Sequence, residues 1–325
     1  MIAVDMDGTL LGADGCVSEG NLRAIRRVEA AGVEVVVATG RRHTYAMRQL
    51  RALGLRPDAV IVSSNGTVTR TVGSGLVGSG LVGSRVVDRT VMARETAMWL
   101  CGAMGEFRDA LVMTFDRVGE DGEDERGSLV VEHMEALNAS IGKWMAANEP
   151  YLERVVPIER ALAGAAPIQM MVCGTVERMR RAEALLLGYA GVAAAGITGE
   201  TAGAEVALSR TEYPERGLSI LDILPGGCSK GVALGRLAAR RGYGVDQMMA
   251  IGDNWNDVSM LEIAGRAVLM ANAPGDLLAV AEARGWRVGG LHDEDGVARA
   301  IEEVCAELGA NGVDLVGQSA GLFAR

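Results

Sequence analysis

The chain has 325 residues, of which 49% are hydrophobic, and a formal net charge of −10 at pH 7. That length is enough for two domains of ordinary size, each with its own core. The negative charge argues against nucleic acid and against an anionic membrane surface as partners, because neither attracts an acidic protein. It does not exclude a small anionic ligand, which needs only a local positive site.

The hydropathy and the cysteines bear on where the protein works. The mean hydropathy is +0.18, and no apolar stretch approaches the ~18–20 residues that a membrane helix requires. The cysteines are scattered, odd in number and without a Cys-x-x-Cys pair, which is typical of small core residues in a reducing compartment. They are Cys16, Cys101, Cys173, Cys228 and Cys305. We therefore expect a cytoplasmic protein.

The first element is a short strand followed by two carboxylates. The apolar run Ile2–Val4 predicts a strand that ends in a turn at Gly8, and Asp5 and Asp7 lie between them. Two carboxylates at this spacing can hold a hard cation such as Mg²⁺, or act as a nucleophile and a proton carrier. At this point an ordinary acidic loop is an equally good interpretation.

Helices and strands then alternate over the first part of the chain. Ser18 can cap a helix that extends to Ala31. A strand over 33–38, a helix over about 44–53 and a strand over 59–62 are predicted to follow. This rhythm predicts a doubly wound parallel sheet, whose functional site lies at the carboxyl ends of the strands.

The rhythm breaks in the middle of the chain. A Gly/Ser-rich repeat at 73–84 indicates a flexible linker or a hairpin. Beyond it, mixed elements with short connections predict an α+β domain, in which the acidic run 119–127 is expected to be a solvated loop tip. The predicted helices are 94–104, 132–147 and 176–187, and the predicted strands are 110–115, 128–131, 168–172, 205–209 and 218–223.

The alternating pattern resumes after Pro225. Ser229 can cap a helix that extends to Arg241, and Pro274 can open a later one. The other predicted elements are strands over 248–251 and 267–270 and helices over 258–264 and 294–308. We therefore predict one sheet domain, 1–84 and 225–312, interrupted by an inserted domain, 85–224. No structure is predicted for the tail, 313–325.

Polar residues also follow the second predicted strand. Thr39, Gly40 and Arg41 place a hydroxyl, a glycine and a guanidinium where that strand meets its helix. A hydroxyl and backbone N–H groups at a helix N-terminus form an anion site. Taken alone, Thr-Gly at such a junction is common turn chemistry.

Two later junctions add charged residues. Asp253 and Asp257 follow the strand at 248–251, and Lys230 opens the helix after the insertion. Separately, these are typical of a helix cap and of surface charge. Together, the four junctions supply a nucleophile, a proton carrier, donors for phosphate oxygens and acidic ligands for Mg²⁺. That set of groups suits phosphoryl transfer.

These junctions resemble the motifs of the haloacid dehalogenase superfamily, in its Cof-type phosphatase branch. The resemblance implies a doubly wound parallel-sheet core with an inserted α+β cap, which stands where this branch carries its cap. A further segment, Ser64-Asn65-Gly66, also resembles the family. The four motifs are Asp5-Met-Asp7-Gly-Thr-Leu-Leu, Ala38-Thr39-Gly40-Arg41, Ser229-Lys230-Gly231 and Gly252-Asp253-x-x-Asn256-Asp257.

The resemblance also implies catalytic and metal-binding roles. Asp5 would attack phosphorus, and Asp7 would protonate the leaving oxygen and then activate water. Mg²⁺ would be held by Asp5, the backbone carbonyl of Asp7, and Asp253, with Asp257 acting directly or through water. A second Asp followed by Gly-Thr points to phosphate rather than halide chemistry, because a halide needs no acid to leave.

Further residues are implied to contact the phosphate or the substrate. Thr39, Gly40 and Lys230 would bind the phosphoryl oxygens, and Asn256 would orient Lys230 or the phosphate. Arg41 and Asn65, near the mouth of the site, are possible substrate contacts.

The predicted function is that of a Mg²⁺-dependent phosphatase of small phosphorylated metabolites, with sugar phosphates as the leading class. In enzyme terms this is a phosphoric monoester hydrolase. The nearest alternative is a phosphosugar mutase. The catalytic core does not distinguish the two activities, because they differ in how well the cap excludes water. A non-catalytic sensor of phosphorylated metabolites is the other, although a sensor needs neither the nucleophile nor the acid.

Overall fold

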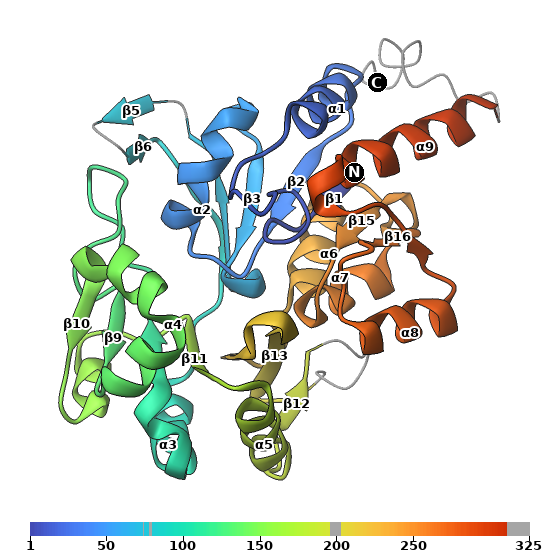
Figure 1. Ribbon diagram of the computed structural model, residues 1–325. Helices are drawn as coiled ribbons and strands as arrows, with labels where there is room; N and C mark the ends of the chain where they lie inside the picture. Colours follow the sequence, from blue (N-terminus) through green and yellow to red (C-terminus); the bar gives the residue numbers. More distant parts are fainter. Residues whose placement is uncertain (74, 78–79, 196–202, 311–325) are drawn as a thin grey trace.

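The computed structural model describes residues 1–73, 75–77, 80–195 and 203–310, and it contains two large sheets (Figure 1). The first sheet has the strand order β17-β16-β15-β1-β2-β3-β4-β7. Its members are β1 (Ile2–Val4), β2 (Val35–Ala38), β3 (Val60–Ser63), β4 (Val68–Thr71), β7 (Val86–Arg89), β15 (Met249–Gly252), β16 (Arg266–Leu269) and β17 (Arg287–Val288).

Helices cover both faces of this sheet, which explains its apolar strands. One face packs on α1, α2 and α9, and the other on α6, α7 and α8. The four residues of β2, Val35–Ala38, are all buried between these layers. The helices are α1 (Glu19–Ala30), α2 (His43–Leu50), α6 (Lys230–Arg241), α7 (Val258–Ile263), α8 (Gly275–Arg284) and α9 (Gly296–Ala310). The predicted doubly wound core is confirmed.

One edge of the core sheet differs from the prediction. β4 and β7 extend the sheet in antiparallel fashion beyond β3, and neither was expected from the sequence. The physical reason lies at Ser64 and Asn65, whose positive φ angles of 48° and 52° reverse the chain directly after β3. β17 at the opposite edge was also missed.

The second sheet forms the cap, in the order β10-β9-β8-β11-β14-β13-β12. It mixes parallel and antiparallel pairs, as the predicted α+β insertion requires. Its strands are β8 (Leu111–Thr114), β9 (Leu129–Val131), β10 (Leu152–Arg154), β11 (Gln169–Gly174), β12 (Val192–Ala194), β13 (Val206–Tyr213) and β14 (Leu218–Pro225). Its helices are α3 (Arg94–Ala103), α4 (Glu135–Ala147) and α5 (Val176–Leu187).

The chain leaves the first sheet later than predicted. The insertion was expected to begin at residue 85, but β7, Val86–Arg89, pairs with β4 in the core sheet. On the return, β14 ends at Pro225, where the second core segment was expected to begin. We therefore place the first boundary after Arg89. The tail predicted at 313–325 lies outside the described residues.

The Gly/Ser repeat contains a small hairpin. β5 (Gly75–Val77) and β6 (Gly80–Val82) pair antiparallel, which favours the hairpin over the linker among the two predicted alternatives. Figure 1 shows the pair projecting from the core beside α2. Residues 74 and 78–79 lie outside the described part.

The acidic run 119–127 is a solvated loop tip, as predicted, only in part: Glu120, Asp121, Glu125 and Arg126 are exposed, whereas two carboxylates between them contact the core. The Asp124 side chain is 6% exposed and forms an ion pair with Arg42 of the core at 2.7 Å. Glu123, 12% exposed, pairs with Arg48 of α2 at 3.0 Å. Because the matching cations lie on α2 and at its N-cap, this part of the cap loop packs against the core.

No helix among the described residues is long and apolar enough to cross a membrane.

Candidate active site

The carboxyl ends of β1 and β15 bring Asp5 and Asp253 together. The two strands are parallel neighbours, and the Asp5 N–H donates to the Ile251 carbonyl at 2.9 Å. Both carboxylates are buried. Gly8, with a φ of +77°, crosses directly beside Asp253, and a Cβ there would overlap that carboxylate. Glycine is therefore required for the loop to close over the site.

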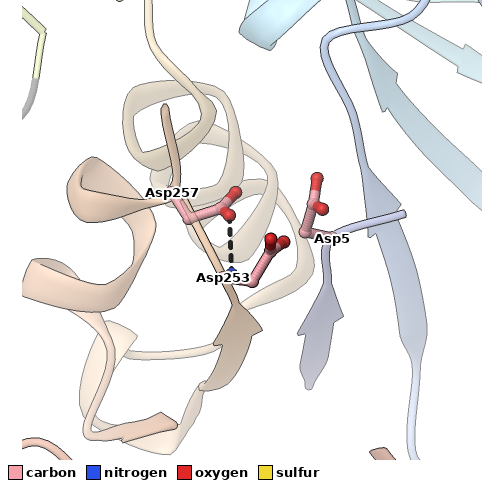
Figure 2. Close-up of side chains that lie close together, drawn as sticks. All are labelled: Asp5, Asp253 and Asp257. Atoms are coloured by element: carbon pink, nitrogen blue, oxygen red, sulfur yellow. Dashed lines mark hydrogen bonds between the residues drawn. The ribbon is translucent and has the colours of Figure 1, made fainter. Parts of the chain in front are cut away.

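Asp257 joins them from the next turn of chain, Trp255–Asp257. One of its oxygens accepts the backbone N–H groups of Asp253 and Asn254, each at 3.0 Å. Thr9 donates from its hydroxyl to Asp253 at 2.8 Å. These bonds fix the carboxylates so that their oxygens lie close together, as Figure 2 shows.

Lys230 is the cation of the cluster. It opens α6, which is capped by Ser229 accepting the Val232 N–H at 3.1 Å. Its Nζ donates to Asp5 and, at 2.7 Å, to Asp257, and the side chain is fully buried. Gly66 permits this placement, because a Cβ at that position would overlap the Ser229 carbonyl. The turn after β3 thus packs directly against the start of α6.

The electrostatics of the cluster show more negative charge than Lys230 balances. Burial, then the neighbouring Asp257, raises the pKa of Asp5 to about 7. Burial and the charge of Asp5 raise the pKa of Asp253 well above its ordinary value. Burial acts to lower the pKa of Lys230, but Asp257 and Asp5 outweigh it and hold that pKa above its usual range. The carboxylates therefore favour a further cation.

The donor set fits a divalent metal ion. Asp5, Asp253 and Asp257 each offer a carboxylate oxygen, and these atoms all lie within 4.8 Å of one another. Hard cations such as Mg²⁺ take oxygen ligands of this kind. Three buried carboxylates beside a single lysine also leave the charge that such an ion would neutralise.

Asp7 is held differently from Asp5. Both of its carboxylate oxygens accept hydrogen bonds from Arg41, one of them at 2.8 Å from Nε. Arg41 itself is positioned by the end of β2, because its backbone N–H donates to the Thr39 hydroxyl at 3.1 Å. The predicted phosphate-binding and substrate-binding residues of this segment therefore lie beside the predicted acid.

The predicted residues Asn65 and Asn256 connect the core to the cap. Asn256 donates to the Asn65 side-chain oxygen at 3.2 Å, and Asn65 donates to Asp222 of β14 at 2.8 Å. Gln169 of β11 donates to the other Asp222 oxygen at 2.6 Å. Asn256 was expected to orient Lys230 or the phosphate, and the hydrogen bond to Lys230 is made by Asp257. Burial raises the pKa of Asp222 to about 7.

A cavity of ≈ 290 Å³ lies between the core and the cap. Asp5, Asp7, Gly40, Arg41 and Asn256 line it from the core. Thr39, Asn65, Lys230, Asp253 and Asp257 were also predicted site residues, and they stand behind this lining and hold it in place.

Sequence reasoning missed the cap side of the cavity. Asp222, Leu218 and Ile220 alternate along β14 and line the cavity together, as residues two apart on one strand face do. The period-2 pattern was visible in the sequence, but the face that it marks could not be assigned to core or site. Asn254 was also missed as a link between the domains. It exchanges two hydrogen bonds of 2.9 Å with the backbone of Glu212 on β13.

A buried carboxylate, an acidic cluster and a lysine at the strand ends of a capped α/β sheet define a hydrolase of the phosphoryl-transfer type. The family profile of haloacid dehalogenase-like hydrolases matches residues 2–81 and 204–301, more than half of the chain. The chain belongs to this family. The predicted Cof-type assignment and the predicted enzyme class, a phosphoric monoester hydrolase, are confirmed.

Relatives match most of the chain. The 5-amino-6-(5-phospho-D-ribitylamino)uracil phosphatase YwtE of Bacillus subtilis is 27% identical over 93% of this chain and 97% of its own length. "Endoribonuclease YBEY, chloroplastic" of Arabidopsis thaliana is 29% identical over 92% of this chain, and the chain spans 45% of that longer protein. The crystal structure of SMU.1108c from Streptococcus mutans UA159 supports the fold, with a TM-score of 0.68 at 20% identity over 94% of this chain and 98% of that one.

Proposed function

We propose that the protein is a Mg²⁺-dependent phosphatase of small phosphorylated metabolites that works through an aspartyl-phosphate at Asp5. One observation carries this proposal. Asp5 is a buried carboxylate that lines the cavity, in hydrogen-bond contact with Lys230 and within reach of two further carboxylates. Lys230, together with a divalent cation held by the carboxylates, would attract a phosphate ester and activate such a weak nucleophile.

Both steps of the proposed reaction use Asp5 and Asp7. An Asp5 oxygen forms a bond to phosphorus while the bond from phosphorus to the leaving oxygen breaks, and Asp7 gives that oxygen a proton. Asp7 then takes a proton from water, whose oxygen attacks phosphorus and releases the Asp5 carboxylate. One Asp thus serves as acid and then as base, and inorganic phosphate leaves.

Arg41 bears on the state of Asp7. It holds both Asp7 oxygens in the present structure and lines the same cavity. A phosphate group entering the cavity would compete for this guanidinium, which matches the bidentate geometry of phosphate oxygens as well as that of carboxylates. We therefore assign Arg41 two roles, substrate contact and release of Asp7 for proton transfer.

The metal and phosphate ligands follow from the cluster. Asp5, Asp253 and Asp257, with the Asp7 backbone carbonyl, would hold Mg²⁺, which would neutralise the phosphoryl oxygens and the gathered carboxylates. Lys230 would share the charge of the phosphoryl group, and the Thr39 hydroxyl and the backbone at Gly40 would donate to its oxygens. Asn256, whose side-chain oxygen is buried without a partner in the structure, faces the same cavity.

The substrate class is proposed at two levels. A small phosphorylated metabolite suits the size of the cavity and the activity for which the Bacillus subtilis relative is named. Sugar phosphates are the finer class predicted from the sequence. The cytoplasmic location predicted from the cysteines agrees with all five being free thiols.

The test is release of inorganic phosphate from a panel of phosphate monoesters. We expect turnover with Mg²⁺, loss of turnover with EDTA, and none in Asp5→Asn. Phosphate transfer to a second metabolite, with little free phosphate, would favour the mutase. Equal rates with Mg²⁺ and EDTA, or full activity in Asp5→Asn, would refute the proposal.

A further inference from the structure

One wall of the active-site cavity is apolar. It faces Asp5 and Asp7 across the ≈ 290 Å³ space and comes entirely from the cap. We call it the cap wall. It consists of Leu129, Ile141, Trp144, Met171, Leu218 and Ile220. If the phosphate group of an ester binds at Asp5, its organic group would therefore contact the apolar side chains of the cap wall.

The cap wall exists because helices cover the cap sheet unequally. On one face, alternate residues such as Leu221 and Ile223 of β14 pack in a core with α3 and α5. On the other face, Leu218 and Ile220 of the same strand pack beside α4 but remain only partly buried. Figure 1 shows α3 and α5 at the end of the cap away from the core sheet. The half-covered apolar face is thus the one turned to the catalytic carboxylates.

Trp144 is fixed at the edge of this wall. Its backbone carbonyl accepts the Asn148 side-chain amide at 2.8 Å, and the Asn148 oxygen accepts from Arg42 of the core at 2.9 Å. The helix departs from regular geometry at Ile141, three residues earlier, where φ is −129° and ψ is 33°. The indole is therefore carried on a turn that is tied to the core side of the cavity.

The cap also contributes polar groups to the lining, and one of them is already committed. Asp222 already accepts from Asn65 and Gln169, one bond on each oxygen. Thr114, Thr211, Tyr213 and Arg216 complete the cap's polar lining. A polyol bound here would press several hydroxyl groups against the wall, and each hydroxyl that loses its water without a new partner lowers affinity by about tenfold.

We propose that the cap wall selects phosphate monoesters whose leaving group is a single, weakly hydroxylated ring carried on a short arm, with Trp144 as a specificity-determining residue. The inference rests on the proposed phosphatase function and narrows its substrate class. The volume agrees, because ≈ 290 Å³ lies just below the range for small-molecule sites, roughly 300–1,000 Å³. One ring and one phosphate fit such a space.

The experiment compares two esters of the same shape. Cyclohexylmethyl phosphate and glucose 6-phosphate both attach phosphate through a CH₂ group to a saturated six-membered ring, and both leave as primary alcohols. We expect kcat/KM for the cyclohexylmethyl ester to exceed that for glucose 6-phosphate by about tenfold or more. A ratio of one or below overturns the inference while leaving the phosphatase intact.

Two variants of the cap wall and one control test whether the wall causes the preference for the cyclohexylmethyl ester. Trp144→Ala is expected to reduce the ratio of the two kcat/KM values by about tenfold. Trp99→Ala is the matched control. Trp99 lies on α3, its ring centroid is 5.1 Å from that of Tyr189, and it does not line the cavity. Ile220→Thr, which adds a hydroxyl to the wall, is expected to shift the ratio in the same direction by a few-fold. An unchanged ratio in both Trp144→Ala and Ile220→Thr overturns the assignment.

A binding measurement separates this inference from the proposed function. Calorimetry of both esters with Asp5→Asn reads the preference of the wall without turnover. Tighter binding of the cyclohexylmethyl ester supports the inference, and tighter binding of glucose 6-phosphate overturns it. Absence of turnover of both esters by the wild-type protein, with that binding preference intact, counts against the phosphatase and not against the wall.

Discussion

Asn254 joins the loop after β15 of the core to a strand of the cap. Its side-chain oxygen accepts the Glu212 N–H at 2.9 Å, and its side-chain nitrogen donates to the Glu212 carbonyl at 2.9 Å. Both residues are buried. Asn254→Ala would remove both partners from the Glu212 backbone, so it tests whether this bridge holds the cap against the core.

The size of the effect follows from the two groups left behind. A buried backbone donor or acceptor that loses its partner costs about 1–3 kcal/mol, so two of them should lower the free energy of unfolding by about 3 kcal/mol. With a urea dependence of about 3 kcal/mol per molar, the unfolding midpoint should fall by about 1 M. We also expect KM to rise, because the cap that completes the cavity is less firmly placed.

Urea unfolding and steady-state kinetics of the variant measure both effects. Asn138→Ala is the control, because Asn138 is exposed on α4 and its truncation should move the midpoint very little. Equal midpoints for the two variants would refute the bridge. A lower midpoint with an unchanged KM would show that the bond stabilises the fold without shaping the cavity.

Three further predictions test the charges of the structure. Asp124→Asn breaks a buried ion pair between cap and core and should lower the free energy of unfolding by about 3 kcal/mol, while the exposed Glu125→Gln should not; equal effects would contradict the pair. Lys230→Met should reduce kcat by at least about 10³-fold, against no change in the exposed Lys143→Met, and near-normal turnover would contradict its role. Burial raises the pKa of Asp222 to about 7 from an unfolded value of about 3.9, so the stability that it contributes is present below pH ~4 and lost as the pH rises to ~7. Asp222→Asn should flatten that decline in urea unfolding between pH 4 and 7, and an identical pH slope would contradict the shift.

The meeting of Asp5 and Asp253 in the candidate site could be predicted because each of these two residues follows a buried strand directly. Asp5 comes after Ile2–Val4, and Asp253 comes after Met249–Gly252, so local sequence order already places them at the same edge of a parallel sheet. The order and spacing of these residues, Thr39 and Lys230 then matched the motifs of the haloacid dehalogenase superfamily. The chemistry of the core is thus encoded in short segments that can be read one at a time.

The contacts between the domains could not be read in this way. Arg42 and Asp124 are 82 residues apart, and each looks like surface charge until the fold brings them together. The same holds for Asp222, which is one polar residue in an apolar strand until Asn65 and Gln169 surround it. Pairings of this kind depend on which face of the cap meets the core, and the sequence of either domain alone does not contain that information.

The antiparallel edge of the core sheet lies between these cases. β4 was missed because no element was predicted between the strand at 59–62 and the Gly/Ser repeat. Asn65-Gly66 was a usable signal, since Asn and Gly both tolerate positive φ and this dipeptide commonly reverses a chain between strands. The turn was interpreted as part of the predicted site, and its effect on the direction of the chain was overlooked.

The central claim is that Asp5 becomes covalently phosphorylated. Wild-type protein is mixed with excess cyclohexylmethyl phosphate and Mg²⁺, quenched in acid within one turnover and digested, and its peptides are weighed by mass spectrometry. We predict a phosphate adduct on the N-terminal peptide that contains Asp5, lost on incubation at neutral pH and absent from Asp5→Asn. Phosphate release without any adduct, together with an active Asp5→Asn, would contradict the account.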